Sequence, residues 1–336
     1  MKRNIRALSM ALALLMLALV LPHAALAATK PAELRVAQWR QNQSSLIIYT
    51  TAMGQNGYVA DELSYDPNGY YVQLDDGYDL KITGVQAFSS TGESVHYILC
   101  CDISKSISSE QFEIERAALS SFGKSLDAKD HVSLITFGDT ATTEASYVSG
   151  ADLSNYVNKV DYLDSNTHLY EALNMAVDLT NSNSRTERCV LIVITDGDDD
   201  PGDTESLVSY QDINKTLSER QVPLYIISLN TKYTNVANPS MLARTSGGTT
   251  FDAGSNNAIT DCLNKVRTLT QRGPVVTAQL VQDGTYTGVQ QNELLVIMDA
   301  YSALYSQDDY NITVRWNQAE ATPGPTQTPI RRAAST

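Results

Sequence analysis

The stretch that decides the fold is Tyr97-Ile98-Leu99-Cys100-Cys101-Asp102-Ile103-Ser104-Lys105-Ser106. Its first four residues are apolar without alternation, which is typical of a parallel strand buried on both faces. Asp102, Ser104 and Ser106 follow at alternate positions, where such a strand opens into a loop. The alternation directs one carboxylate and two hydroxyl groups toward one point. We therefore expect a polar site at the carboxyl end of this strand.

Two other segments are expected to bring further oxygen atoms to the same place. Val190–Ile194 is a second continuous apolar run, and it ends in Thr195-Asp196-Gly197. Thr167 stands at the start of a helical pattern, in a loop between the two runs. Because parallel strands end at the same edge of a sheet, five oxygen donors are predicted to converge there. They are Asp102, Ser104, Ser106, Thr167 and Asp196.

The surrounding segment, residues 94–272, alternates short apolar runs with helical patterns. Further apolar runs are Val132–Phe137 and Leu224–Ile227, and apolar residues recur at helical spacing in 112–126, 169–176 and 259–266. This alternation predicts an α/β fold with a doubly wound, mostly parallel sheet.

Together these residues resemble the von Willebrand factor type A (vWA) domain, a Rossmann-like fold that also occurs as the inserted domain of integrins. The Asp-x-Ser-x-Ser pattern, Thr167 and Asp196 resemble the family's metal-ion-dependent adhesion site (MIDAS), and all five positions are filled. The resemblance covers about half of the chain. It implies a protein-binding or adhesion module in which Mg²⁺ coordinates an acidic residue of a protein partner. Lys105 and Ile107 depart from the Gly and Met that are frequent in the family, but they remove no ligand.

The donor types are consistent with this metal. Oxygen ligands with only two carboxylates suit Mg²⁺ or Mn²⁺. The alternative is that the Ser and Thr residues merely cap helices. The acidic run 196–203 does not have EF-hand spacing, so we expect a solvated loop there, with a Ca²⁺ site as the alternative. We interpret His96, His131 and His168 as ordinary strand and loop residues.

The flanking segments have the period-two patterns of β-strands. Residues 28–93 include Asp75-Asp76-Gly77, which predicts a hairpin between strands at 70–74 and 78–82. Three more strands are expected in 273–318, at 275–282, 293–299 and 311–316. Three strands alone are marginal, so we predict that they complete a small β-sandwich with the first segment, into which the α/β domain is inserted. Residues 319–336 are predicted to form a Pro/Thr-rich linker and tail.

The first 27 residues predict export. Lys2, Arg3 and Arg6 precede an apolar run, and Ala25-Leu26-Ala27 offers a cleavage site, as in a secretory signal peptide. An uncleaved membrane anchor is the alternative, although the run is short for a span. The mature chain keeps 21 basic and 38 acidic residues, a formal charge of −17. Such a charge excludes general nucleic-acid binding, and we expect a secreted or cell-surface protein without a membrane span in its mature part.

The four cysteines, Cys100, Cys101, Cys189 and Cys262, are expected to be reduced, mostly in the core, with a disulfide as the alternative.

The chain lacks Gly-x-Gly-x-x-Gly after its first α/β strand, a P-loop and a Gly-x-Ser-x-Gly elbow, so we do not expect an enzyme. Two other functions stay open. One is a metal-independent scaffold of a cell-envelope complex, and the other is a Mg²⁺-dependent hydrolase.

Overall fold

The computed structural model describes residues 31–42, 45–54, 59–60, 63–73, 81–162, 166–180, 187–202, 207–220, 222–231, 234–254, 258–279, 293–299 and 310–315. The predicted signal peptide, the hairpin turn at 75–77 and the Pro/Thr-rich tail lie outside these residues. Among the described helices, none is both long enough and apolar enough to cross a bilayer.

A six-stranded sheet forms the centre of the larger part, in the order β10-β9-β8-β5-β6-β7. Its members are β5 (Val95–Asp102), β6 (His131–Phe137), β7 (Ala141–Ser149), β8 (Arg188–Thr195), β9 (Leu224–Leu229) and β10 (Thr250–Ala253). All pairs are parallel except β6 with the edge strand β7. Every residue of β5, β8 and β9 is buried, as their continuous apolar sequences require. The predicted fold class is confirmed.

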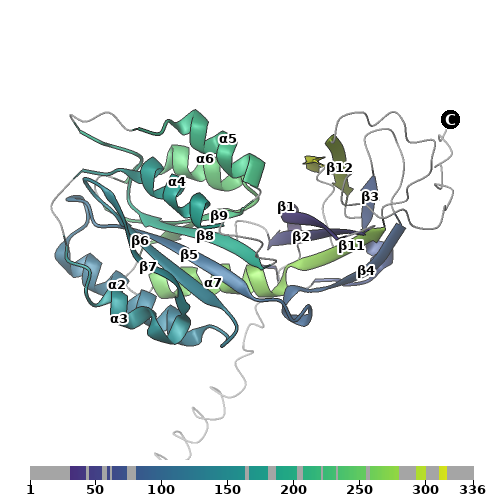
Figure 1. Cartoon of the computed structure of the whole chain (residues 1–336), viewed down its shortest axis with the longest axis horizontal. Helices are drawn as coiled ribbons and strands as arrows, with labels where there is room; N and C mark the ends of the chain where they lie inside the picture. The colour runs from purple at the N-terminus through teal and green to yellow at the C-terminus, as the bar shows by residue number, and fades with distance from the viewer. Residues whose placement is uncertain are drawn as a thin grey trace, which may run out of the picture.

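Helices cover both faces of this sheet (Figure 1). One face carries α4 (Leu169–Thr180), α5 (Tyr210–Arg220) and α6 (Ala237–Thr245), whose apolar residues share one core cluster with Ile98, Leu191 and Ile226. The other face carries α2 (Ser109–Ser125), α3 (Leu153–Val157) and α7 (Ala258–Arg272), which pack on Tyr97, Leu99 and Ile192. Short 3-10 turns are η2 (Pro67–Gly69), η3 (Phe88–Ser90) and η4 (Gly150–Asp152).

The loop after β5 is short because a capping box begins α2 directly behind it. The Ser108 side chain accepts a hydrogen bond from the Gln111 backbone N–H, and the Gln111 side chain accepts one from the Ser108 N–H. Glu110 in the first turn and Lys124 in the last turn also suit the helix dipole. The segment between Asp102 and α2 is therefore held in a tight turn.

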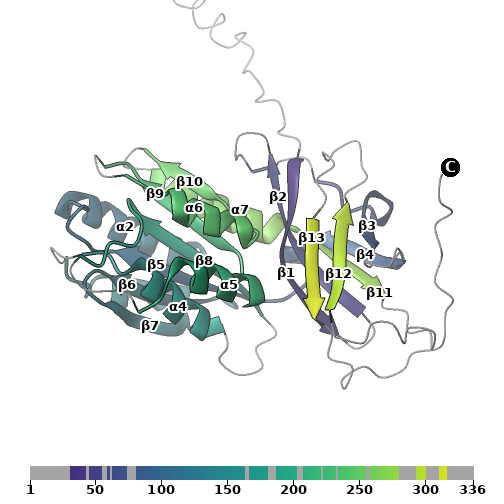
Figure 2. The same ribbon diagram turned by 90° about the horizontal axis from the view of Figure 1, so that it is seen from above.

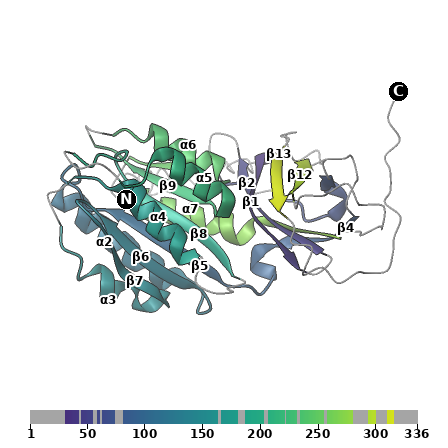
Figure 3. The ribbon, with the colours of Figure 1, turned by 45° about the horizontal axis from the view of Figure 1, so that its top comes forward.

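The smaller part contains two antiparallel sheets, which lie one over the other (Figure 2, Figure 3). One has the order β1-β2-β11-β4, formed by β1 (Pro31–Asn42), β2 (Ser45–Gly54), β4 (Lys81–Ala87) and β11 (Pro274–Gln279). The other has the order β13-β12-β3, formed by β3 (Tyr71–Gln73), β12 (Glu293–Asp299) and β13 (Tyr310–Arg315). Strand β11 pairs with β2 on one side and with β4 on the other. Strands that precede the α/β part in the sequence therefore share a sheet with a strand that follows it.

Of the predicted hairpin across Asp75-Asp76-Gly77, residues 74–80 lie outside the described residues, and the described strands on either side of the turn pair elsewhere. Strand β3 pairs with β12, whereas β4 pairs with β11, so the strands before and after the turn belong to different sheets. The turn residues favour a reversal of the chain, but they do not decide which strand becomes the hydrogen-bonding partner. Here that partner comes from more than 180 positions away in the sequence.

The two parts share a buried junction. Tyr49, Phe88 and Val275 belong to the same core cluster as the residues under α2 and α7. The Thr51 and Tyr225 hydroxyls lie 3.0 Å apart, and Arg35 donates to the carbonyl of Gly248. Arg188 is 1% exposed, donates to the Thr270 carbonyl at 2.8 Å and lies over the Tyr49 and Phe88 rings. Burial lowers the pKa of this guanidinium, and the aromatic faces partly replace its lost hydration.

Truncation after Arg272 should unfold the first β segment, because β2 and β4 would lose the strand that both of them pair with. Hydrogen exchange should show loss of amide protection in β2. Truncation after Gln318 is the control, since it leaves every described strand in place. Protection in β2 equal to that of the full chain would contradict the role of β11.

Gly247→Ala should destabilise the protein more than Gly92→Ala. Both glycines have positive φ, 86° and 79°, so each alanine adds backbone strain of about 1 kcal/mol. A Cβ at Gly247 would also lie 2.3 Å from the Val36 carbonyl oxygen in β1, whereas a Cβ at Gly92 meets nothing within 4 Å. Denaturant unfolding should therefore show an additional loss of about 1–3 kcal/mol for Gly247→Ala. Equal losses would mean that this turn does not pack tightly on β1.

Candidate metal centre

The predicted site residues stand at the carboxyl edge of the parallel sheet. Asp102 is the last residue of β5, and Asp196 directly follows β8, the strand beside it. Ser104 and Ser106 lie in the loop between β5 and α2, and Thr167 lies just before α4. A pocket of about 750 Å³ opens here, and Ser104, Ser106, Thr167 and Asp196 line it. Asp102 is fully buried next to it.

A chain of hydrogen bonds links the two carboxylates. The Ser104 N–H donates to Asp102 Oδ1 at 2.9 Å, and the Ser104 and Ser106 hydroxyls lie 3.1 Å apart. The Ser106 hydroxyl donates to Asp196 Oδ1 at 2.8 Å. The structure therefore brings these four side chains into one continuous polar cluster.

Thr167 lines the same pocket from a different loop. Its backbone N–H donates to the Asp200 carbonyl at 2.9 Å, and the Asp200 N–H returns a bond of 2.8 Å to the Thr167 carbonyl. The His168 N–H also donates to the carbonyl of Gly138, after β6. These bonds fix the Thr167 loop between the end of β6 and the loop after β8, which explains how Thr167 comes to line the pocket.

Burial makes this pair of carboxylates costly without a cation. Asp102 is 0% exposed and Asp196 1% exposed. The pKa of Asp102 is raised to about 6, first by burial and also by the nearby charge of Asp196, against hydrogen bonds from Ser104 and Thr195 that lower it. Among the described residues, no Lys, Arg or His forms an ion pair with either carboxylate. A cation bound between them would remove this cost.

The donor set fits a small, hard cation. It offers two carboxylates and three hydroxyls, and oxygen ligands of this kind suit Mg²⁺ or Mn²⁺. Within the described ranges, no three His, Cys, Asp or Glu side chains gather as a metal cluster. A metal here would therefore depend on the hydroxyl groups as well as on the two aspartates.

Three residues that the sequence analysis did not select also support the site. Thr195 donates to Asp102 Oδ2 at 2.6 Å, and Thr231 donates to Asp196 Oδ2. The Asn235 N–H donates to the Asp196 carbonyl at 2.9 Å. Thr195 ends β8, so the rule that located Asp196 could also have located it, whereas Thr231 and Asn235 lie in the loop after β9 and could be found only from the fold.

We expected the acidic run after Asp196 to be a solvated loop, but two of its carboxylates are engaged in hydrogen bonds with other elements. Asp198 accepts the Tyr170 hydroxyl at 2.6 Å and a bond from the Asn238 amide, and Asp199 accepts the Tyr170 N–H at 2.9 Å. Burial, followed by the Asp198 hydrogen bond, raises the pKa of Tyr170. These carboxylates connect the loop to α4 and α6, and none of these contacts indicates a Ca²⁺ site.

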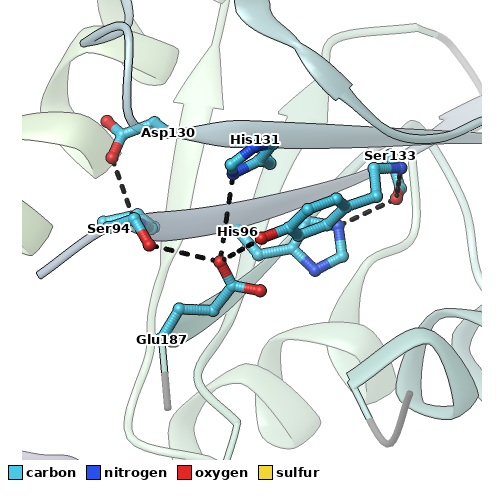
Figure 4. A network of polar contacts seen from close by, with 8 residues as sticks. Ser94, His96, Asp130, His131, Ser133 and Glu187 are labelled. Carbon is cyan, nitrogen blue, oxygen red and sulfur yellow. Dashed lines mark hydrogen bonds and ion pairs between the residues drawn. The ribbon is translucent and has the colours of Figure 1, made fainter. Parts of the chain in front are cut away.

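The histidines are less scattered than their sequence positions suggest. His96 and His131 are register partners on β5 and β6 and lie close together (Figure 4). Both stand near the starts of their strands, whereas the pocket lies at the carboxyl ends. The His131 ring stacks on Tyr147 with centroids 3.9 Å apart, and its Nδ1 lies 4.0 Å from Glu187 Oε2. The Tyr147 hydroxyl donates to the same oxygen at 2.8 Å. His168 is buried beside the pocket loops, with Nδ1 3.4 Å from Glu171.

The four cysteines are free and buried. Burial raises the pKa of Cys100 and of Cys101, so neither thiol has the character of a metal-binding thiolate. Cys101 stands beside Glu115, a buried carboxyl on α2 whose pKa burial also raises. These two groups lie on the α2 face of the sheet, behind the pocket.

Comparison with known proteins identifies the α/β part. The sequence profile of the von Willebrand factor type A domain matches residues 98–266. No curated protein matches the sequence.

The chain is also similar to several solved structures. The conserved hypothetical protein BatB from Bacteroides thetaiotaomicron is 18% identical, with a TM-score of 0.44, over 52% of this chain and 98% of its own. Proximal thread matrix protein 1 from the mussel byssus, in a form with a zinc-occupied MIDAS motif, is 16% identical, with a TM-score of 0.46, over 58% and 49%. The pilus adhesin SpaC from Lactobacillus rhamnosus GG is 9% identical, with a TM-score of 0.45, over 84% and 48%.

Stabilisation by Mg²⁺ should disappear in acid. The pKa of Asp102 in the folded, metal-free protein is about 6, raised by burial, so below this pH a metal must displace a proton. Without metal, the raised pKa of Asp102 makes the free energy of unfolding decrease as the pH rises from the ordinary pKa of an aspartate, 3.8, to about 6. Calorimetry should show a rise in Tm on adding Mg²⁺ at about pH 7.5 and a much smaller rise at about pH 5. Asp102→Asn is the control and should show no rise at either pH. An equal rise at both pH values in the wild type would contradict the site.

Proposed function

The chain belongs to the von Willebrand factor type A domain family, and we propose that it is an exported protein-binding module that works through a bound Mg²⁺ or Mn²⁺. The ligands in this proposal are Asp102, Ser104, Ser106, Thr167 and Asp196. The remaining coordination position would be filled by a carboxylate of the protein partner. The proposal includes no catalytic step.

The observation that supports it best is the hydrogen-bonded chain from Asp102 through Ser104 and Ser106 to Asp196, beside an open pocket. Hydroxyl groups carry no charge and are weak ligands, so they leave a bound cation strongly electrophilic. Mg²⁺ prefers six ligands in octahedral geometry, and five protein donors leave at least one position at the pocket opening. An acidic side chain is the group best suited to that position.

Charge explains why such a partner would need the metal. The mature chain has a formal charge of −17, counted without residues 1–27. A negative surface repels an acidic partner at long range. The attraction must therefore be local, and a divalent cation in the pocket supplies it.

Export is part of the proposal because of residues 1–27. Their basic start, apolar run and small residues before the cleavage position are the features of a secretory signal. A location at the cell surface or outside the cell would also place the protein where divalent cations are available and partners on other cells can be reached.

Removing the charge of Asp102 should abolish metal binding without unfolding the protein. Calorimetry with Mg²⁺ should show one site in the wild type, no detectable binding to Asp102→Asn, and binding to Thr167→Ala weaker by roughly threefold to tenfold, since Thr167 contributes only a neutral donor. Asp252→Asn is the matched control, because Asp252 is an exposed carboxylate on β10 and its loss changes the net charge equally.

Partner binding gives the second measurement. The wild type should capture its partner from native cell surfaces with Mg²⁺ and release it with a chelator, and Asp102→Asn should capture none. If the wild type binds no Mg²⁺ or Mn²⁺ even with an acidic peptide present, the metal-dependent mechanism is wrong. Capture that survives both the chelator and the Asp102→Asn change would instead establish a metal-independent scaffold.

A further inference from the structure

Lys105 occupies an unusual position in the candidate metal centre. It lies between the two serines of the Asp-x-Ser-x-Ser pattern and lines the same pocket. Ser104 is 1% exposed and Ser106 is half-buried, and both contribute to the hydrogen-bonded chain, whereas Lys105 is exposed. The loop that supplies two hydroxyl ligands therefore also presents an ammonium group to whatever enters the pocket.

The ammonium is held in place by the neighbouring loop. Lys105 Nζ donates to Asn166 Oδ1 at 3.3 Å, and the Asn166 N–H donates to Asp139 Oδ1 at 3.0 Å. A Cβ on Gly202 would lie 2.9 Å from Asn166 Nδ2, and Gly202 has a φ of 66°. A glycine at this position therefore leaves the space that the Asn166 side chain occupies. Since Thr167 follows Asn166, the contact of Lys105 with Asn166 joins the two loops that carry the hydroxyl ligands.

The electrostatics of the pocket are one-sided. Among the described residues that line it, Lys105 is the cation, and Asp196, Asp198, Asp199 and Asp200 are the anions. The lysine bonds to an amide, which is neutral, so this contact does not cancel its charge. An additional anionic group on a ligand would be repelled on the side of the aspartates and attracted on the side of Lys105.

We propose that Lys105 is a specificity-determining residue that selects partner segments with two acidic side chains, one on the metal and one on Lys105. This inference rests on the proposed metal-dependent function and names the ligand class for the same site. An ion pair with a second carboxylate is stronger than a bond to a neutral group. A segment with a single acidic residue would use the metal alone.

The same charge has opposite effects on the metal and on the ligand. The ammonium repels a divalent cation, so Lys105→Met should bind Mg²⁺ about threefold to tenfold more tightly than the wild type. It should also bind a diacidic ligand more weakly by a similar factor. A merely structural role could not produce these opposite signs, because loss of loop structure weakens both.

The experiment uses calorimetry on the full chain with Mg²⁺ alone, and then with three capped peptides in saturating Mg²⁺. The peptides are Gly-Gly-Asp-Gly-Gly and two versions with Glu in place of the first or the last Gly. The wild type should bind at least one diacidic peptide about threefold or more tightly than the peptide with a single Asp. Lys105→Met should lose this preference, whereas Lys105→Arg, which keeps the positive charge, should retain it. Lys124→Met is the matched control, since Lys124 is an exposed lysine at the far end of α2.

The outcomes separate this inference from the proposed function. If the wild type binds Mg²⁺ and the peptides but shows no diacidic preference, or if Lys105→Met keeps that preference, the role of Lys105 is wrong and the metal site stands. If Lys105→Met weakens Mg²⁺ and peptide binding together, Lys105 is structural and the inference is overturned. If the wild type binds no Mg²⁺ or Mn²⁺, the proposed function itself fails.

Discussion

The site depends on one constraint, which is the burial of two carboxylates at the ends of neighbouring strands. Asp102 and Asp196 are brought together because β5 and β8 are adjacent and parallel, so their carboxyl ends meet. Buried like charges destabilise a fold unless hydrogen bonds or a cation compensate them. The hydroxyls of Ser106, Thr195 and Thr231 provide part of this compensation. The residues that follow the carboxyl ends of β5 and β8 thus provide the donors that a cation would need.

The same two strands connect the site to the rest of the molecule. β8 begins with Arg188, whose guanidinium lies over Tyr49 and Phe88 at the junction with the β-sandwich, and Asp196 directly follows its other end. β5 begins at Val95, in the core cluster that contains both aromatic residues, and ends in Asp102. An eight-residue strand spans about 26 Å. The junction and the candidate metal centre therefore lie at opposite ends of two fully buried strands.

The sequence predicted the parts of the structure whose signal is local. Continuous apolar runs located β5, β6, β8 and β9, and the predicted strand at 293–299 agrees with β12. Two strands of the six-stranded sheet were missed for a physical reason. β7 is an edge strand with many exposed polar residues, such as Thr142 and Thr143, and β10 has only four residues, so neither forms an apolar run. The pairing of β3 with β12 was missed because partner choice depends on distant strands. In the site, the ends of apolar strands located Asp102 and Asp196, whereas Thr231 stands in a loop without a pattern and could be found only from the fold.

The acidic residues beside the pocket hold its loops together. Their negative charge would also restrict which ligands a bound metal could attract. Asp198 and Asp199 bind Tyr170 and so connect the loop after β8 to the start of α4, and Asp200 pairs with Thr167 through its backbone. The carboxylates that order the pocket also make its surroundings negative. A bound divalent cation would offset this field only close to the metal, because salt screens it over about 10 Å. The acidic ligand that we propose would therefore approach from the side where negative charge is least dense. In the described pocket that side is formed by Lys105 and Asn166, so in the proposed function the contact that joins the two hydroxyl-bearing loops would also set the direction from which a partner binds.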